Sequence, residues 1–143
     1  MFDHSAGRSK EGRVLIVDDE ESIRKTIGLI LTKSGFDVVE AKDGKDAITN
    51  IHLGDNPLRI DTIICDIRMP EIDGEQAIKY FRSQFPSVPI VVLTGFPDVK
   101  LAVGLMKNGV KDYLVKPIDK EKLLSVITKS VKEHLILQDN IVV

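Results

Sequence analysis

The feature that most constrains the fold of this chain is a series of short apolar runs, each followed at once by a reactive polar side chain. These side chains are Asp18 and Asp19 after 14–17, Asp66 after 63–65, Thr94 after 90–93, and Lys116 after 113–115. Runs of this length, with amphipathic helical patterns between them, indicate buried β-strands joined by helices. If the strands are parallel, all five side chains meet at the edge where open α/β sheets place their chemistry.

The alternation predicts one α/β domain built from five strand–helix units. The predicted strands are 14–17, 38–41, 62–65, 89–93 and 112–115. The first, third and fourth runs are apolar on both faces, as expected of central strands covered by helices on both sides. Right-handed crossovers then favour a doubly wound five-stranded parallel sheet of order 2-1-3-4-5. In that order the first and third strands are neighbours, and their three aspartates share one crevice.

The length of 143 residues fits a single domain. We assign 1–12 to a flexible arm, 13–135 to the domain, and 136–143 to a C-terminal tail or the start of a linker. The net charge of −2 offers no basic field for nucleic acid. No apolar stretch is long enough to span a bilayer. The only cysteine, Cys65, lies within an apolar strand, which predicts a core residue and a cytoplasmic protein.

Each polar residue at this edge also has a purely structural interpretation. Asp18 or Asp19 could cap the following helix, Asp66 could stabilise a turn, and Thr94 and Lys116 could be an ordinary strand residue and a surface lysine. Their coincidence at four strand ends favours a common function. Three close carboxylates repel one another unless a cation joins them, and Mg²⁺ prefers such ligands. A carboxylate can attack phosphorus, while a lysine and a hydroxyl can hold the phosphoryl oxygens.

No other reactive constellation competes with this one. The chain has no GxxxxGK[ST] phosphate loop and no dinucleotide fingerprint. His4, His52 and His134 are scattered without metal-ligand spacing. There is no plausible serine or cysteine triad.

In combination, four motifs resemble the receiver domain of two-component response regulators over residues 13–135. They are Val17-Asp18-Asp19-Glu20, Asp66-Ile67-Arg68-Met69-Pro70-Glu71-Ile72-Asp73-Gly74, Leu93-Thr94-Gly95, and Asp112-Tyr113-Leu114-Val115-Lys116-Pro117. The stretch from Thr94 to Pro117 is most similar to receivers of the nitrogen-regulation type. Such receivers commonly precede ATPase and DNA-binding domains. The resemblance implies a flavodoxin-like receiver fold.

The resemblance also implies a role for each matching residue. Asp66 is the phosphoacceptor, and Mg²⁺, with Mn²⁺ as a substitute, is bound by Asp18, Asp19, Asp66 and the backbone carbonyl of Arg68. Thr94 and Lys116 contact the phosphoryl group, and the peptide bond between Lys116 and Pro117 is cis. Thr94 and Tyr113 form the switch. Arg68 and Phe96 tune the lifetime of the phosphoryl group, and the bulk of Phe96 predicts a long-lived phosphoform.

The implied function is a phosphorylation-activated switch rather than an enzyme with an external product. Its partner is a sensor histidine kinase or phosphotransfer protein, and its output is an attached domain or a homodimer. The contact surface would combine the helix from Val99, the strand from Asp112 and the helix from Asp119. The first of these helices carries Val99, Ala102, Val103 and Met106 on one stripe, and we expect Val99, Val103 and Ile127 to leave apolar surface.

Three alternatives remain open at this stage. The chain could be a stand-alone phosphorelay intermediate. An aspartyl-phosphate phosphatase is disfavoured because Asp66 is not followed by the D-x-D pattern. A flavin-binding module is disfavoured because there is no phosphate-cradling loop and no tryptophan.

Overall fold

The protein forms a five-stranded parallel sheet of order β2-β1-β3-β4-β5, as the alternation of strands and helices predicts. The computed structural model describes residues 11–67, 74–95 and 99–141. The elements in chain order are β1 (Arg13–Val17), α1 (Glu21–Lys33), β2 (Asp37–Ala41), α2 (Gly44–Ile51), α3 (Asn56–Arg59), β3 (Ile60–Asp66), α4 (Gly74–Gln84), β4 (Ile90–Thr94), α5 (Val99–Lys107), β5 (Asp112–Val115) and α6 (Lys120–Ile141).

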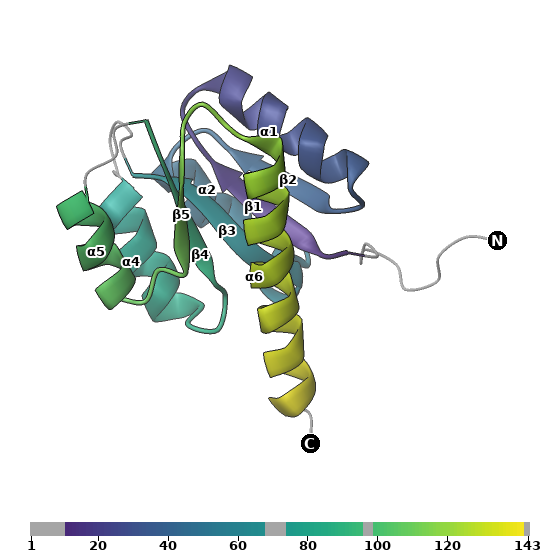
Figure 1. Ribbon diagram of the computed structural model, residues 1–143. Helices are drawn as coiled ribbons and strands as arrows, with labels where there is room; N and C mark the ends of the chain where they lie inside the picture. Colours follow the sequence, from purple (N-terminus) through teal and green to yellow (C-terminus); the bar gives the residue numbers. More distant parts are fainter. Residues whose placement is uncertain (1–10, 68–73, 96–98, 142–143) are drawn as a thin grey trace.

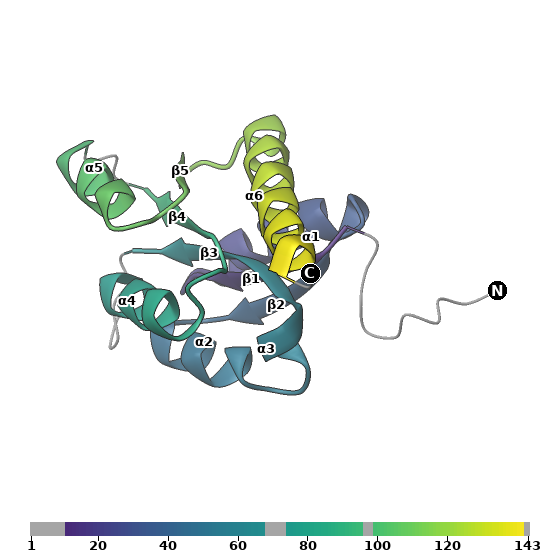
Figure 2. The ribbon, with the colours of Figure 1, turned by 90° about the horizontal axis from the view of Figure 1, so that it is seen from below.

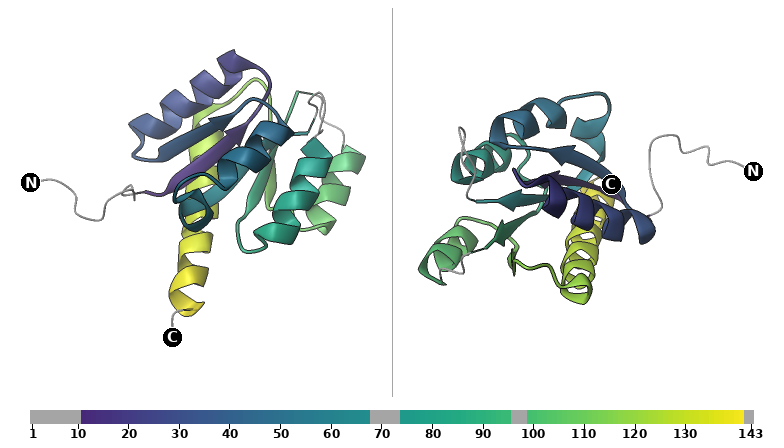
Figure 3. Two further views of the ribbon diagram at one scale, coloured as in Figure 1. Left: turned by 180° about the vertical axis from the view of Figure 1, so that it is seen from behind. Right: turned by 90° about the horizontal axis from the view of Figure 1, so that it is seen from above.

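The sheet lies between two layers of helices, so the domain has two apolar cores (Figures 1 and 2). One core packs α1 and α6 on the first face through residues such as Ile27, Leu31 and Ile127. The other packs α2, α4 and α5 on the second face through residues such as Phe81 and Leu105. The same layering is visible from behind and from above (Figure 3). Because both faces are covered, all seven residues of β3 are buried.

Local sequence signals account for the start and end of several elements. Asp43 caps α2 by accepting a hydrogen bond from the backbone N–H of Asp46 at 2.8 Å. Gly35 follows α1 with φ of +97°, a left-handed conformation that suits glycine at a helix end. The segment before β3 contains a short helix of its own. There α2 ends at Ile51, and the separate short helix α3 begins with Pro57 in its first turn.

Of the two helices expected to leave apolar surface, α6 differs from the expectation and α5 agrees with it. Ile127 is fully buried against α1 and the sheet, so the prediction that it leaves apolar surface is wrong. Helix α5 turns Leu105 inward and exposes Val99, Val103 and Met106. Helix α6 continues to Ile141 and projects beyond the sheet, through residues expected to form a tail or linker (Figure 1).

Among the described residues, no helix combines the length and the apolar character needed to cross a membrane.

Candidate functional site

The strand register brings the polar strand ends together at one edge of the sheet. Val17 of β1 pairs with Cys65 of β3, so Asp18 and Asp66 leave neighbouring strands side by side. On the other side of β3, Asp66 pairs with Leu93, the residue before Thr94. Parallel strands therefore deliver these side chains to a common rim, as the sequence predicts.

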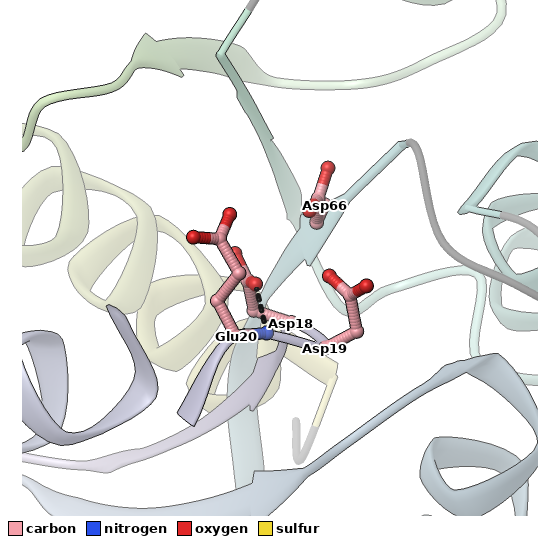
Figure 4. A group of neighbouring side chains, drawn as sticks. All are labelled: Asp18, Asp19, Glu20 and Asp66. Carbon is pink, nitrogen blue, oxygen red and sulfur yellow. Dashed lines mark hydrogen bonds between the residues drawn. The ribbon is translucent and has the colours of Figure 1, made fainter. Parts of the chain in front are cut away.

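Four carboxylates gather at this rim. One oxygen from each of Asp18, Asp19, Glu20 and Asp66 lies within 4.8 Å of the others. Figure 4 shows these side chains converging from the ends of β1 and β3. Asp18 and Asp66 are buried, whereas Asp19 and Glu20 are exposed. The cluster thus has a buried half within the crevice and an exposed half facing solvent.

Lys116 reaches into the cluster from the end of β5. Its Nζ lies 2.8 Å from Glu20 Oε1, 2.9 Å from Asp18 Oδ2 and 3.3 Å from Asp66 Oδ2. The backbone N–H of Lys116 donates to the carbonyl of Thr94 at 2.8 Å, and the peptide bond to Pro117 is cis. One ammonium group therefore contacts three carboxylates that come from two strands and a helix start.

The electrostatics of the rim depend on this lysine. Burial raises the pKa of Asp18, and the neighbouring charge of Asp66 adds to that effect, against the hydrogen bonds from the Glu20 backbone and Lys116. Burial alone lowers the pKa of Lys116, but the carboxylates of Glu20, Asp18 and Asp66 outweigh it and raise the pKa above its usual range. Lys116 therefore stays charged, and Asp18 is harder to ionise than an ordinary aspartate.

The acidic residues fit a hard divalent cation. Asp18 Oδ2 is buried and lies 2.9 Å from the Lys116 ammonium. Its other oxygen, Oδ1, accepts the backbone N–H of Glu20 at 2.8 Å, which fixes the orientation of the carboxylate. Oriented carboxylate oxygens with solvent on one side are the ligands that Mg²⁺ prefers. Asp18, Asp19 and Asp66 are the side chains that could hold it.

Thr94 and Tyr113 occupy neighbouring strands beside the carboxylates. Thr94 is buried at the end of β4 and pairs with Val115 of β5. Tyr113 is half-buried and packs against the core on the α4 side of the sheet. Arg68 and Phe96, to which lifetime tuning was assigned, lie outside the described residues, and that assignment stays a prediction.

Two features of the site were not predicted from the sequence. One is the contact of Glu20 with Lys116, for which the only signal is a third acidic residue directly after the aspartate pair. The other is Gly74, the first residue of α4, which lies so close to Asp66 that a Cβ would overlap the Asp66 carbonyl oxygen and the Cα of Ile67. A glycine at this position permits the close approach of the two backbone segments.

Comparison with known proteins places this arrangement among signalling domains. Residues 14–128 match the profile of the response regulator receiver domain. The regulatory protein AtoC of Escherichia coli is 33% identical over 84% of the chain, and the DNA-binding transcriptional regulator NtrC of Proteus hauseri is 30% identical over 87%. These matches include 25% and 26% of the two relatives, so the chain spans about a quarter of their length.

Solved structures agree with the sequence matches. A response regulator receiver domain protein from Clostridium thermocellum superposes with a TM-score of 0.81 at 27% identity, over 88% of this chain and 98% of that one. The Vibrio cholerae chemotaxis protein CheY4 superposes with a TM-score of 0.75 at 32% identity, over 83% of this chain and 98% of that one. The fold and the sequence therefore point to the same family.

Proposed function

Because the chain belongs to the response regulator receiver family of two-component systems, we propose that it is a switch operated by phosphorylation of Asp66. The phosphoryl group comes from a phosphohistidine of a sensor histidine kinase or phosphotransfer protein. The observation that carries this proposal is the buried carboxylate of Asp66, 3.3 Å from Lys116 Nζ and beside two further aspartates. We place the switch in the cytoplasm, where a lone buried Cys65 suits reducing conditions.

In the transfer step an oxygen of Asp66 forms a bond to phosphorus while the bond from phosphorus to the histidine nitrogen breaks. The electron pair of that bond leaves with the imidazole. Bound Mg²⁺ supplies charge neutralisation between the two anionic reactants. Asp18 and Asp19 hold the cation, and Lys116 contributes a compact positive charge to a phosphoryl oxygen.

Switching follows from contacts that exist only after phosphorylation. The Thr94 hydroxyl and the Lys116 ammonium move towards the phosphoryl oxygens, and Tyr113 turns into space vacated by Thr94. The shift can be only as large as the difference in contacts between the two states, and coupling of about 1–3 kcal/mol is typical. The half-buried position of Tyr113 supports this role, because its ring has both a packed and a solvent side.

The surface that responds is formed by α5, β5 and α6. It carries the exposed apolar residues Val99, Val103 and Met106 of α5 and Val115 of β5. Ile127 is not part of it because that side chain is buried. Apolar side chains exposed together favour a protein contact. We propose that this surface, here called the α5–β5 surface, contacts a second copy or an output domain.

The experiment that tests the function is intact mass spectrometry after incubation with acetyl phosphate and Mg²⁺. Wild type should gain one phosphoryl group, and Asp66→Asn and EDTA-treated wild type should gain none. Asp37→Asn serves as a matched control because Asp37 is a half-buried aspartate at the start of β2, away from the rim. An unmodified wild type with an intact fold would contradict the proposal.

A further inference from the structure

Glu20 makes the shortest of the three ion pairs of Lys116, although it is the most exposed partner. Its Oε1 lies 2.8 Å from Lys116 Nζ, across 96 residues of sequence. The Glu20 side chain is 56% exposed, compared with 0% for Asp18 and 6% for Asp66. The lysine is therefore shared between two carboxylates inside the crevice and one at its mouth.

The helix that follows does not explain this glutamate. Glu20 is the N-cap residue of α1, a position that favours Ser, Thr, Asp or Asn. Its side chain makes no capping hydrogen bond. The backbone of Glu20 is instead fixed by its N–H, which donates to Asp18 Oδ1 at 2.8 Å. The Glu20 side chain thus extends from a backbone that is held in place, and its role is the contact with Lys116.

We propose that Glu20 is a positioning residue that holds the Lys116 ammonium at the mouth of the site until a phosphoryl oxygen replaces it. This inference rests on the proposed function. Once Asp18 and Asp66 share a divalent cation, Glu20 is the carboxylate left to Lys116. Glu20 then keeps the Lys116 side chain extended towards the position of the incoming phosphoryl group. The Glu20 carboxylate also balances the charge of Lys116 while no phosphoryl group is present.

The sign of the effect follows from the exchange. In the proposed exchange Lys116 releases Glu20 when it contacts a phosphoryl oxygen, so the Glu20 ion pair stabilises the unphosphorylated arrangement. Removing the carboxylate should strengthen the binding of a phosphoryl group and of its mimics. An ion pair with one exposed partner corresponds to a change of about two- to fivefold in an equilibrium constant.

The first test measures the contact itself in metal-free protein. Wild type, Glu20→Gln and Glu21→Gln are treated with a limiting amine-acylating reagent, and modification of Lys116 is followed by peptide mass spectrometry relative to the other lysines. Glu21 is a matched control because it is an exposed glutamate in the first turn of α1. We expect Lys116 to react about two- to fivefold faster in Glu20→Gln and at the wild-type rate in Glu21→Gln. Equal rates in all three proteins would overturn the inference.

The second test measures the exchange with beryllium trifluoride, a phosphoryl mimic, by calorimetry in the presence of Mg²⁺. Glu20→Gln should bind it about two- to fivefold more tightly than wild type. Glu20→Asp keeps the charge but shortens the reach, so it should resemble Glu20→Gln if the contact matters and wild type if only charge matters. Weaker binding in Glu20→Gln, or wild-type binding in Glu20→Asp, would overturn the inference.

The two failures can be told apart. If wild type neither binds the mimic nor accepts a phosphoryl group from acetyl phosphate, the proposed function fails while the labelling result still reports on the ion pair. If wild type does both and the Glu20 variants match it, the function stands and the role of Glu20 fails.

Discussion

Asp61 and His134 are in direct contact at the edge of the sheet opposite the carboxylate cluster, with Asp61 Oδ1 3.0 Å from His134 Nδ1 and both side chains almost fully buried. The second oxygen of Asp61 accepts the backbone N–H of Arg13 at 3.0 Å. One carboxylate on β3 thereby ties the start of β1 to α6. The same strand carries Asp66 at its other end, so β3 places one aspartate in this structural contact and another in the carboxylate cluster.

Asp61→Ala should lower the free energy of unfolding by about 2–4 kcal/mol, because it removes the acceptor of two buried groups. Chemical denaturation of the metal-free protein measures this. Asp37→Ala is the control, because its ion pair with Arg13 is longer, at 3.5 Å, and its side chain is 44% exposed. That change should cost less than about 1 kcal/mol. An equal decrease in the free energy of unfolding for the two variants would show that the buried contact stabilises the fold no more than the exposed one.

Gly74→Ala should destabilise the fold by about 1–3 kcal/mol, because the new Cβ would overlap backbone atoms of Asp66 and Ile67. It should also slow phosphorylation, since the overlap lies directly behind the acceptor. Gly104→Ala is the matched control within a helix. A Cβ at Gly104 has no neighbour within 4 Å, and that substitution should stabilise by about 0.5–1 kcal/mol. Thermal unfolding of both variants tests the pair, and a neutral Gly74→Ala would contradict the prediction.

Asp18→Asn should stabilise the metal-free protein increasingly as the pH rises. Burial raises the pKa of Asp18 in the folded protein. Between its ordinary and its raised pKa, the folded state holds a proton that the unfolded state has released, so the stability contributed by Asp18 falls as the pH rises through that range. Asparagine does not titrate, so Asp18→Asn lacks this fall in stability with rising pH. Added Mg²⁺ should stabilise wild type but not Asp18→Asn. Denaturation curves of wild type and Asp18→Asn across the acidic pH range, with and without Mg²⁺, measure both effects. An identical response of the two proteins would contradict the role of Asp18 as a buried cation ligand.

Thr94→Ala should accept a phosphoryl group on Asp66 but fail to change its partner contacts, because the hydroxyl is needed only once the phosphoryl group is present. Intact mass measures the first property, and binding of the phosphorylated protein to its partner measures the second. Normal partner binding by the phosphorylated variant would contradict the switch.

Val103→Lys should leave stability within about 0.5 kcal/mol of wild type, because Val103 is exposed. It should weaken self-association or partner binding through the α5–β5 surface. Leu105→Ala, two residues further along the same helix, should cost about 2–5 kcal/mol because Leu105 faces the core. Analytical ultracentrifugation of phosphorylated protein tests the first change and denaturation the second. If Val103→Lys associated like wild type, α5 would not be part of the contact surface.

The sheet order and the convergence at its rim were predictable because both follow from backbone rules. Apolar runs of strand length, right-handed crossovers and parallel register together place Asp18, Asp66, Thr94 and Lys116 at one edge. No side-chain detail was needed for that step.

Contacts that depend on side-chain reach were not predictable in the same way. The Glu20–Lys116 and Asp61–His134 pairs join residues 96 and 73 apart, and no local pattern links their members. The error at Ile127 has a local cause, since Leu123, Ile127 and Val131 recur every four residues on one buried stripe. For α5, the expectation that Val99 and Val103 leave apolar surface is confirmed, since both are exposed.

Because Cys65 is buried, the reactivity of its thiol can report on local opening of the folded protein. It is the only cysteine of the chain, it lies in the central strand with no exposed surface, and burial together with the charges of Asp66 and Asp18 raises the pKa of its thiol. Cys65 belongs to the core that packs α2, α4 and α5 on the sheet, so a thiol reagent can reach it only when that core opens. The rate of thiol labelling under native conditions therefore measures how often this core opens. Comparing that rate with and without phosphorylation would show whether the switch also changes the cohesion of the sheet on which it is built.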